Sequence, residues 1–436
     1  MFSQETWTLD DCVSYALEHN LQLNDFKYNT ESSRETYRQS FRNLLPSVTA
    51  FSDYGIRFGR SVDPNDNSIS DTEFFTNTYS LEASLDLFQG FQKLNGIKAS
   101  KFIYKATEEE TLQQKFLLAF RVMQAFYDIQ FFEGSLTIAK EQESISQTNY
   151  DLVKKQIELG LMAGADLYEA ESILLTDKLS VTQADNQLKA AKLILTQEMN
   201  LKGTIDISVE VNTSKEITNP ETFEIRSDSI FDKAKDFMPI IKAGKFREEA
   251  AKKQLAVERG KLYPTLSLFT GYGTGYYETI TDSLGVIIPY RDQFRDNSFQ
   301  FIGLSLSIPI SNGWSSRSSI KQQKIAQLRA ENDLAIQEQE LYETIQDIVQ
   351  QYEALQIEYI QTKKAMESQS LAFTIAQKRY EKGLINSIDL FTTKNLFATA
   401  QNQNLMVRLS LEVNKSTLDF YRGLPVFNMD ANASVK

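Results

Sequence analysis

Apolar and polar residues alternate with a period of two along four segments of the chain. These segments cover about residues 47–60, 75–88, 264–277 and 299–310. A period of two is typical of β-strands, because successive side chains point to opposite faces of a sheet. In the first segment, Val48, Ile56 and Phe58 alternate with Asp53 and Arg57. The pattern therefore predicts two long hairpins, each with one apolar and one polar face.

Helical periodicity covers most of the remaining chain. Proline-free segments with apolar residues at spacings of three and four run from about residue 90 to 159 and from about residue 315 to 382. At about 1.5 Å per residue, each helix would be on the order of 100 Å long, which exceeds the diameter of a compact domain. Shorter helical patterns cover about residues 8–43, 166–199, 229–263 and 389–421, and Thr8 is expected to cap the first of them.

This order of helices and strands occurs twice. Pro46 and Pro264, which precede the first strand of each copy, are 218 residues apart. The glycine-aromatic pairs after the second strand, at 90–91 and 313–314, are 223 residues apart. The extra residues of the second copy therefore lie in the loop between its strands, where insertions are tolerated. We interpret the chain as a first repeat at 1–200, a linker at 201–228, a second repeat at 229–421 and a tail at 422–436.

Each copy also contains a helical hairpin tip. Gly160 interrupts the long helical pattern of the first copy, and Gly383 interrupts that of the second copy. Asp166 and Asp389 follow, each six positions after its glycine. Glycine readily adopts the left-handed conformation that ends a helix, and the short segment before each aspartate can cap the next helix. The tips are predicted at about residues 160–166 and 383–389.

The composition limits where a membrane-spanning part could lie. No run of about 18 apolar residues occurs, so strands would have to carry any membrane role. The net charge of −12 and the pI near 4.9 argue against binding of nucleic acid, which requires basic surfaces. Residues 1–5 lack the basic start and apolar run of a signal peptide, although the numbering could equally begin at a mature terminus.

Few residues could carry catalysis or bind a cofactor. The single histidine, His19, has no nearby cysteine, and we interpret the single cysteine, Cys12, as a buried helix residue. The glycine-rich segment 271–275 is similar to a phosphate-binding loop, but no helix follows it and its glycines fall on the polar face of a strand. We therefore expect no enzyme activity, no cofactor and no metal site.

Four strands of this length need neighbours if they lie in a membrane. Backbone groups within lipid must all be paired, so a four-stranded sheet with two free edges cannot lie there alone. Two copies would give eight strands and a filled lumen, whereas three would give twelve and leave room for passage. A soluble sheet packed against helices is the alternative interpretation.

Several side chains on these strands are candidates for particular positions in such a pore. The lumen would be lined by Asp53, Arg57, Glu82 and Asp86, which could select solutes or only keep the interior hydrated. Aromatic residues near the strand ends are candidates for an interfacial girdle, namely Tyr54, Phe58, Phe74, Phe75, Tyr272, Tyr276, Tyr277 and Phe299.

The order of these motifs resembles one known family. The segment 8–20, the Leu-Pro or Tyr-Pro entry to a strand, the glycine-aromatic exit and the doubled Gly-Leu tips are similar to those of the TolC-like outer membrane efflux proteins, over about residues 7–424. The resemblance implies a mainly α-helical homotrimer. Its twelve-stranded β-barrel would lie in the bacterial outer membrane and continue into a twelve-helix α-barrel in the periplasm. The linker and tail would form an equatorial belt.

The resemblance also implies the positions of functional residues. In this family the hairpin tips form the periplasmic entrance, so Asp166 and Asp389 would lie at its constriction, although a helix cap explains either residue without a channel. Some members have a second acidic residue three positions after the later aspartate, where this chain has Thr392. A periplasmic adaptor would dock on the tips through Gly160, Leu161, Gly383 and Leu384.

Two functions are compatible with the sequence. The resemblance implies a passive exit channel in the outer-membrane lipid, part of a tripartite efflux or type I secretion system. Such a channel receives its cargo from an inner-membrane pump through the periplasmic adaptor. The alternative is a structural coiled-coil adhesin or fibre protein without a conduit, which the long helices alone would allow.

Overall fold

The computed structural model describes residues 6–62, 67, 69–161, 163–202, 207–210 and 226–427. The chain forms two compact units, and each unit contains segments from both sequence repeats. The first unit comprises 1–29, 108–242 and 335–436, and the second comprises 30–107 and 243–334. Most of the predicted linker and tail lie outside the described residues. Within the described part of the chain, no helix combines the length and apolar character needed to span a bilayer.

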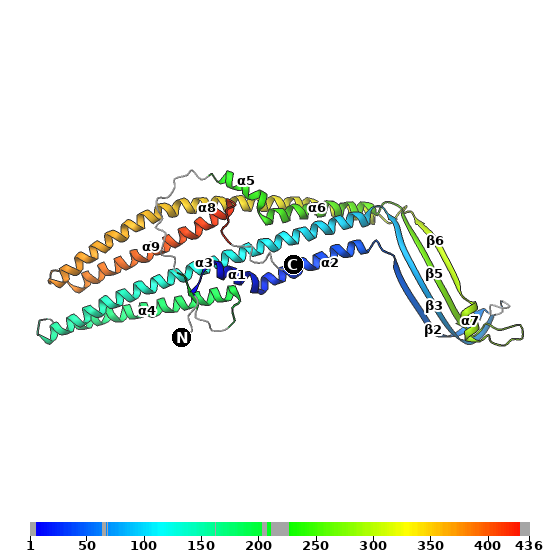
Figure 1. Ribbon diagram of the computed structural model, residues 1–436, viewed down its shortest axis with the longest axis horizontal. Coiled ribbons are helices and arrows are strands. Elements are labelled where there is room, and N and C mark those ends of the chain that lie inside the picture. The colour runs from blue at the N-terminus through cyan, green and yellow to red at the C-terminus, as the bar shows by residue number, and fades with distance from the viewer. Residues whose placement is uncertain are drawn as a thin grey trace. The chain divides into compact units, whose positions relative to one another are not determined.

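The second unit is organised around a four-stranded antiparallel sheet (Figure 1). Its strands are β2 (Ser47–Val62), β3 (Ile69–Gln89), β5 (Thr265–Tyr277) and β6 (Phe299–Ser307), in this spatial order. The central pair, β3 and β5, joins the hairpin of the first repeat to the hairpin of the second. Among the described residues, the outer strands β2 and β6 each have one edge without a strand partner.

The pairing register places the apolar residues of all four strands on one face. Leu81 of β3 lies between Ala50 of β2 and Tyr272 of β5, and Leu268 of β5 lies opposite Leu304 of β6. The predicted division into an apolar and a polar face is therefore confirmed. Three proposed girdle residues were placed wrongly, because alternation puts them on the polar face. These three are Phe74, Tyr277 and Phe299.

The segment between β5 and β6 is more than the loop that the sequence predicts at about 278–298. It contains α7 (Tyr290–Asp296), a helix of 7 residues, which is too short to produce a recognisable helical period. The strand that follows ends at Ser307, before the predicted end near residue 310.

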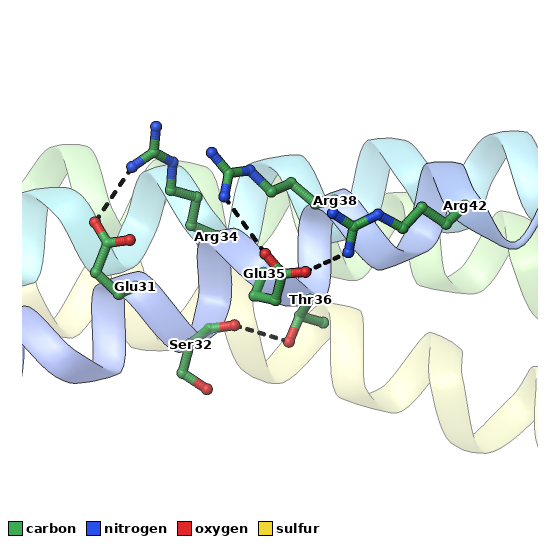
Figure 2. A network of polar contacts seen from close by, with 7 residues as sticks. All are labelled: Glu31, Ser32, Arg34, Glu35, Thr36, Arg38 and Arg42. Atoms are coloured by element: carbon green, nitrogen blue, oxygen red, sulfur yellow. Dashed lines mark hydrogen bonds and ion pairs between the residues drawn. The ribbon is translucent and has the colours of Figure 1, made fainter.

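Helix α2 (Leu21–Arg42) precedes β2 and carries ion pairs along its exposed surface (Figure 2). Glu35 contacts both Arg38 and Arg42, and these contacts, led by the Arg42 hydrogen bond, lower the pKa of its carboxyl. Arg34 lies 3.4 Å from Glu31 in the preceding turn. All of these side chains are exposed, so solvent screens the pairs and each adds little to stability.

Two helical hairpins of nearly equal length account for most of the first unit (Figure 1). They are formed by α3 (Gln92–Glu158) with α4 (Gly164–Met199), and by α8 (Ser315–Glu381) with α9 (Ser387–Tyr421). Helices α3 and α8 have 67 residues each, and both their starts and their ends are 223 residues apart. Helix α6 (Pro239–Gly260) repeats α2 at a distance of 218. The offsets predicted from sequence are thus confirmed.

The largest apolar core of the first unit lies where α1 (Leu9–His19) meets α3 and α4. Its buried side chains include Cys12, Val13, Leu118, Val122, Met123, Phe126, Ile129, Leu188, Leu195 and Met199. The expected burial of Cys12 is confirmed, and burial raises the pKa of its thiol to about 12. Two short strands, β1 (Thr6–Trp7) and β4 (Ser208–Val209), pair in parallel, and Trp7 and Val209 belong to this core. Helix α5 (Ser227–Phe237) belongs to the same unit.

The single helix predicted at 8–43 is wrong, because the chain forms two helices there. Thr8 does cap α1 as predicted, accepting the Asp11 N–H at 3.1 Å. The helix ends at Asn20, whose Oδ1 accepts the Leu23 N–H at 3.0 Å and whose Nδ2 donates to the Glu198 carbonyl at 2.9 Å. Asn20 therefore ends one helix and starts the next through a tertiary partner on α4, which local periodicity cannot indicate.

Candidate functional site at the hairpin tips

Both hairpin tips end their first helix with the same turn. Gly160 has φ 77° and Gly383 has φ 68°, so both occupy the left-handed conformation predicted for them. At the first tip, the Gly160 N–H donates to the Ile157 carbonyl and the Leu161 N–H donates to the Gln156 carbonyl, each at 2.8 Å. The second tip repeats these bonds from Gly383 to Tyr380 and from Leu384 to Arg379. This pair of bonds satisfies carbonyl groups that a helix end would otherwise leave free.

Leu161 and Leu384, the residues after these glycines, are exposed apolar side chains. Leu161 retains 72% of its accessible surface and Leu384 retains 63%. No heavy atom outside the local chain lies within 4 Å of the position that a Cβ would take on Gly160 or Gly383. Each tip therefore presents an open, partly apolar surface.

The two aspartates that follow the tips have different local roles. The Asp166 carboxylate accepts the Ala163 N–H at 3.2 Å and so caps the start of α4. At the second tip this role belongs to Asn386, whose side-chain oxygen accepts the Asp389 N–H at 2.8 Å. The cap interpretation thus describes the side chain of Asp166, whereas capping at the second tip does not require the Asp389 carboxylate.

Thr392 and its counterpart on the first tip show a further difference. The Thr392 hydroxyl donates to the Ile388 carbonyl at 2.8 Å within its own helix. The residue 223 positions earlier is Glu169, so the acidic residue absent from the second tip is present on the first. Glu169 accepts a hydrogen bond from Ser387 at 2.7 Å, which joins the start of α4 to the start of α9. Burial raises the pKa of the nearby Tyr380 phenol, and the negative charges of Asp166 and Glu169 add to this shift.

A buried ion pair joins the two hairpins near their tips. Lys394 of α9 is 2% exposed, and its Nζ contacts the Asp177 carboxylate of α4. The same ammonium donates to Ser146 Oγ of α3 at 2.7 Å, and Ser146 in turn donates to Asp177. Burial lowers the pKa of the Lys394 ammonium, and Asp177 opposes this shift. Three helices from both repeats therefore meet at one charged cluster, which we call the lysine node.

The predicted lumen charges share one face of the sheet, because the register places Asp53, Arg57, Glu82 and Asp86 on its polar side. Asp86 is engaged with neighbours: its Oδ2 lies 3.0 Å from the Lys93 ammonium, and its Oδ1 accepts from Ser267 at 2.8 Å. Among the residues that the structure describes, no group of three or more potential metal ligands is found.

A profile of the outer membrane efflux protein family matches residues 12–200 and 231–424. The chain belongs to this family. The protein is thus an efflux channel of the bacterial outer membrane that extends into the periplasm, and its family consists of transport proteins and not of enzymes.

Similar members of the outer membrane efflux protein family are only distantly related in sequence. The chain is 23% identical over 412 residues to the cation efflux system protein CusC of Escherichia coli O157:H7, covering 93% of this chain and 84% of CusC. It is 20% identical over 340 residues to the outer membrane protein TolC of Vibrio cholerae, covering 76% of this chain and 72% of TolC. A crystal structure of CusC matches with a TM-score of 0.80 and 18% identity over 97% of this chain and 95% of that chain. The outer-membrane channel OprN matches with a TM-score of 0.77 and 16% identity over 95% of this chain and 89% of that chain.

The lysine node of this efflux protein was not identified from the sequence, although a signal for it exists. Lys394 follows the buried Leu390 by four positions, and Asp177 follows the buried Leu174 by three. Both charged residues therefore occupy apolar-stripe positions of their helices, on opposite repeats. Charges of opposite sign on the buried stripes of two neighbouring helices predict an ion pair, because a buried charge without a partner is costly.

Proposed function

We propose that three copies of this chain form a passive exit channel for cargo that an inner-membrane pump delivers through a periplasmic adaptor. The observation that carries this proposal is the sheet. Its apolar residues lie on one face, and each outer strand has an edge without a strand partner among the described residues. Pairing β2 of one copy with β6 of the next would satisfy both edges and close a twelve-stranded barrel.

In the proposed assembly the helices of the three copies form the α-barrel, and the hairpin tips form its periplasmic entrance. Asp389 is the constriction residue with the stronger support, because Asn386 already caps its helix. Asp166 lies at the same level of the duplicated hairpin but serves as a cap, and Thr392 adds a hydroxyl without charge. The exposed Leu161 and Leu384, with the open glycines beside them, suit contact with the tip of an adaptor.

Cargo selection belongs to the pump in this proposal. The polar face of the sheet carries charges of both signs, Asp53, Glu82 and Asp86 against Arg57, which suits a wet conduit for mixed solutes. Either an efflux pump or a type I secretion pump could supply such a channel.

Two measurements on the full chain test the proposal. The protein purified from membranes in detergent is expected to have the mass of three copies by light scattering, corrected for bound detergent. Planar bilayers that contain it are expected to show discrete conductance steps. A monomer that stays in solution without detergent would exclude the proposal, and a trimer without conductance would favour the coiled-coil fibre.

A further inference from the structure

Helix α7 completes the edge of β5 beyond the point where β6 is absent. The last pair between these strands is Gly273 with Phe299, so β5 continues to Tyr277 without β6 beside it. Gln293 of α7 occupies this edge: its Oε1 accepts the Tyr277 N–H at 3.0 Å, and its Nε2 donates to the Tyr277 carbonyl at 3.0 Å. Asn297, just after α7, donates to the Gly275 carbonyl at 2.8 Å. Side-chain amides thus replace the missing strand.

The groups that make these bonds are shielded from solvent. Gln293 is 2% exposed, and its Nε2 also donates to the Ile288 carbonyl at 2.8 Å. The Thr274 hydroxyl, which is also buried, donates to the Phe294 carbonyl of α7. In water a free strand edge is solvated, whereas in lipid each unpaired backbone group costs several kcal/mol. The complete pairing of this edge is what a location in lipid requires.

Helix α7 adds two aromatic rings to the apolar face of the sheet. The centroid of Phe294 lies 5.5 Å from that of Tyr79, and the centroid of Tyr290 lies 5.4 Å from that of Tyr276. The hydroxyls of Tyr290 and Tyr79 are 3.2 Å apart. The cluster continues across the sheet through Phe75 to Tyr54. Phenol groups on an apolar surface are typical of the boundary between hydrocarbon and headgroups.

The distance along β5 places this cluster at one end of the apolar band. The apolar face of β5 begins at Leu266, next to the helices, and reaches Tyr276 ten positions later. A tilted barrel strand crosses the hydrocarbon layer in about 9–11 residues. Tyr276 and α7 therefore lie at the far boundary of the layer if Leu266 lies at the near one.

We propose that α7 is an interfacial helix that rests on the outer boundary of the lipid bilayer and closes the outer rim of the sheet there. This inference rests on the proposed function, because it takes the apolar face as the lipid face. The partner is the lipid surface at the depth of the headgroups. The charges of α7 balance, with Arg291 and Arg295 against Asp292 and Asp296, and Arg295 is paired with both acids. Contact with lipid therefore depends on the aromatic rings and not on attraction to anionic headgroups.

Depth-dependent fluorescence quenching tests this placement. Trp7 and Trp314, which are the 2 tryptophans of the chain, are first replaced by phenylalanine. Single tryptophans are then introduced as Tyr290→Trp on α7, Ile302→Trp in the middle of the apolar face, and Leu284→Trp in the loop before α7. The full-length proteins are reconstituted into phosphatidylcholine vesicles whose acyl chains carry bromine either near the headgroup or near the chain end.

The expected result is a distinct quenching profile for each position. Tyr290→Trp should lose about half of its emission to shallow bromine and less to deep bromine, and Ile302→Trp should show the reverse preference. Leu284, which is 85% exposed, should report no quenching as tryptophan. Phe294→Trp serves as a second α7 variant, in case loss of the Tyr290 hydroxyl displaces the helix.

The outcomes separate this inference from the function on which it rests. Absence of quenching at Ile302→Trp would exclude the sheet from lipid and overturn the proposed function. Quenching at Ile302→Trp without quenching at either α7 variant would overturn the inference alone. Equal quenching at Leu284→Trp would also overturn it, because the whole loop and not α7 would then contact the bilayer.

Discussion

The two hairpins of the first unit have nearly the same backbone and different chemistry. Helices α3 and α8 have 67 residues each, and the turns at Gly160 and Gly383 have the same hydrogen bonds. The lysine node has no such counterpart. At the distance of 223, Lys394 corresponds to Glu171, Asp177 corresponds to Ala400 and Ser146 corresponds to Gln369. Duplication thus preserved element lengths and glycine positions, whereas the polar contacts differ between the repeats.

The same difference extends to the tips. The first tip uses the Asp166 carboxylate to cap its helix because Ala163 has no polar side chain. The second tip uses Asn386, which leaves the Asp389 carboxylate available for another role. Two structurally equivalent aspartates therefore need not be functionally equivalent. The following predictions test that asymmetry.

The largest effect is expected from removing one side of the lysine node. Lys394→Ala leaves the Asp177 carboxylate buried without its cation, and loss of one partner of a buried ion pair costs about 3–5 kcal/mol. Guanidinium unfolding of the detergent-solubilised protein, followed by circular dichroism, measures this loss. Ala400→Ser, at the position on the second hairpin that corresponds to Asp177, is the control and should change stability far less.

A double substitution separates charge from packing at the node. Lys394→Met combined with Asp177→Leu replaces both charges by apolar side chains, and such exchanges are often neutral or stabilising. We expect the double variant to recover most of the stability lost in Lys394→Ala. A double variant as unstable as Lys394→Ala would show that the node contributes by shape and not by charge pairing.

A smaller loss is expected from the cap of the second tip. Asn386→Ala removes the acceptor for the Asp389 N–H and should lower the free energy of unfolding by about 1 kcal/mol. Asn386→Ser keeps an acceptor and should retain most of the stability, as measured by the same unfolding experiment. The second tip would then resemble the first, so an equal stability of Asn386→Ala and the parent would mean that the Asp389 carboxylate has taken over the cap.

Sequence reasoning identified the backbone of this molecule better than its polar contacts. Gly160 and Gly383 were recognisable because a left-handed helix end strongly favours glycine, and the strand faces were recognisable because alternation has a fixed period. The break at Asn20, the amide bonds of Gln293 and the lysine node all depend on partners far away in the chain. Local periodicity contains no information on which distant carbonyl or carboxylate a side chain will meet.

Glu412 of α9 predicts a pH dependence that its counterpart on α4 lacks. Burial raises the pKa of the Glu412 carboxyl above the model value of 4.5, against the opposing charges of Arg408 and Lys415. The unfolded chain releases this proton first, so the contribution to stability is present at low pH and declines as pH rises from about 4.5 through the native pKa. Unfolding measured across this range should show a shallower decline for Glu412→Gln.

The counterpart 223 positions before Glu412 supplies the control. Lys189 is exposed and pairs with Asp185 at 2.6 Å on the surface of α4. Lys189→Gln should therefore leave the slope of stability against pH unchanged. A slope that changes equally in both variants would contradict a specific role for the buried carboxyl.

The smallest effect on stability, and the most informative one for function, is expected at Asp389. Asp389→Asn should change the free energy of unfolding by no more than about 0.5 kcal/mol, because Asn386 keeps the helix cap. In planar bilayers the same variant should lower the preference for cations over anions by about twofold, since each assembled entrance loses three negative charges. Asp166→Asn keeps an acceptor for the Ala163 N–H and is the matched control. An equal change of ion preference in both variants would make the two tips electrostatically equivalent, and no change in either would remove Asp389 from the constriction.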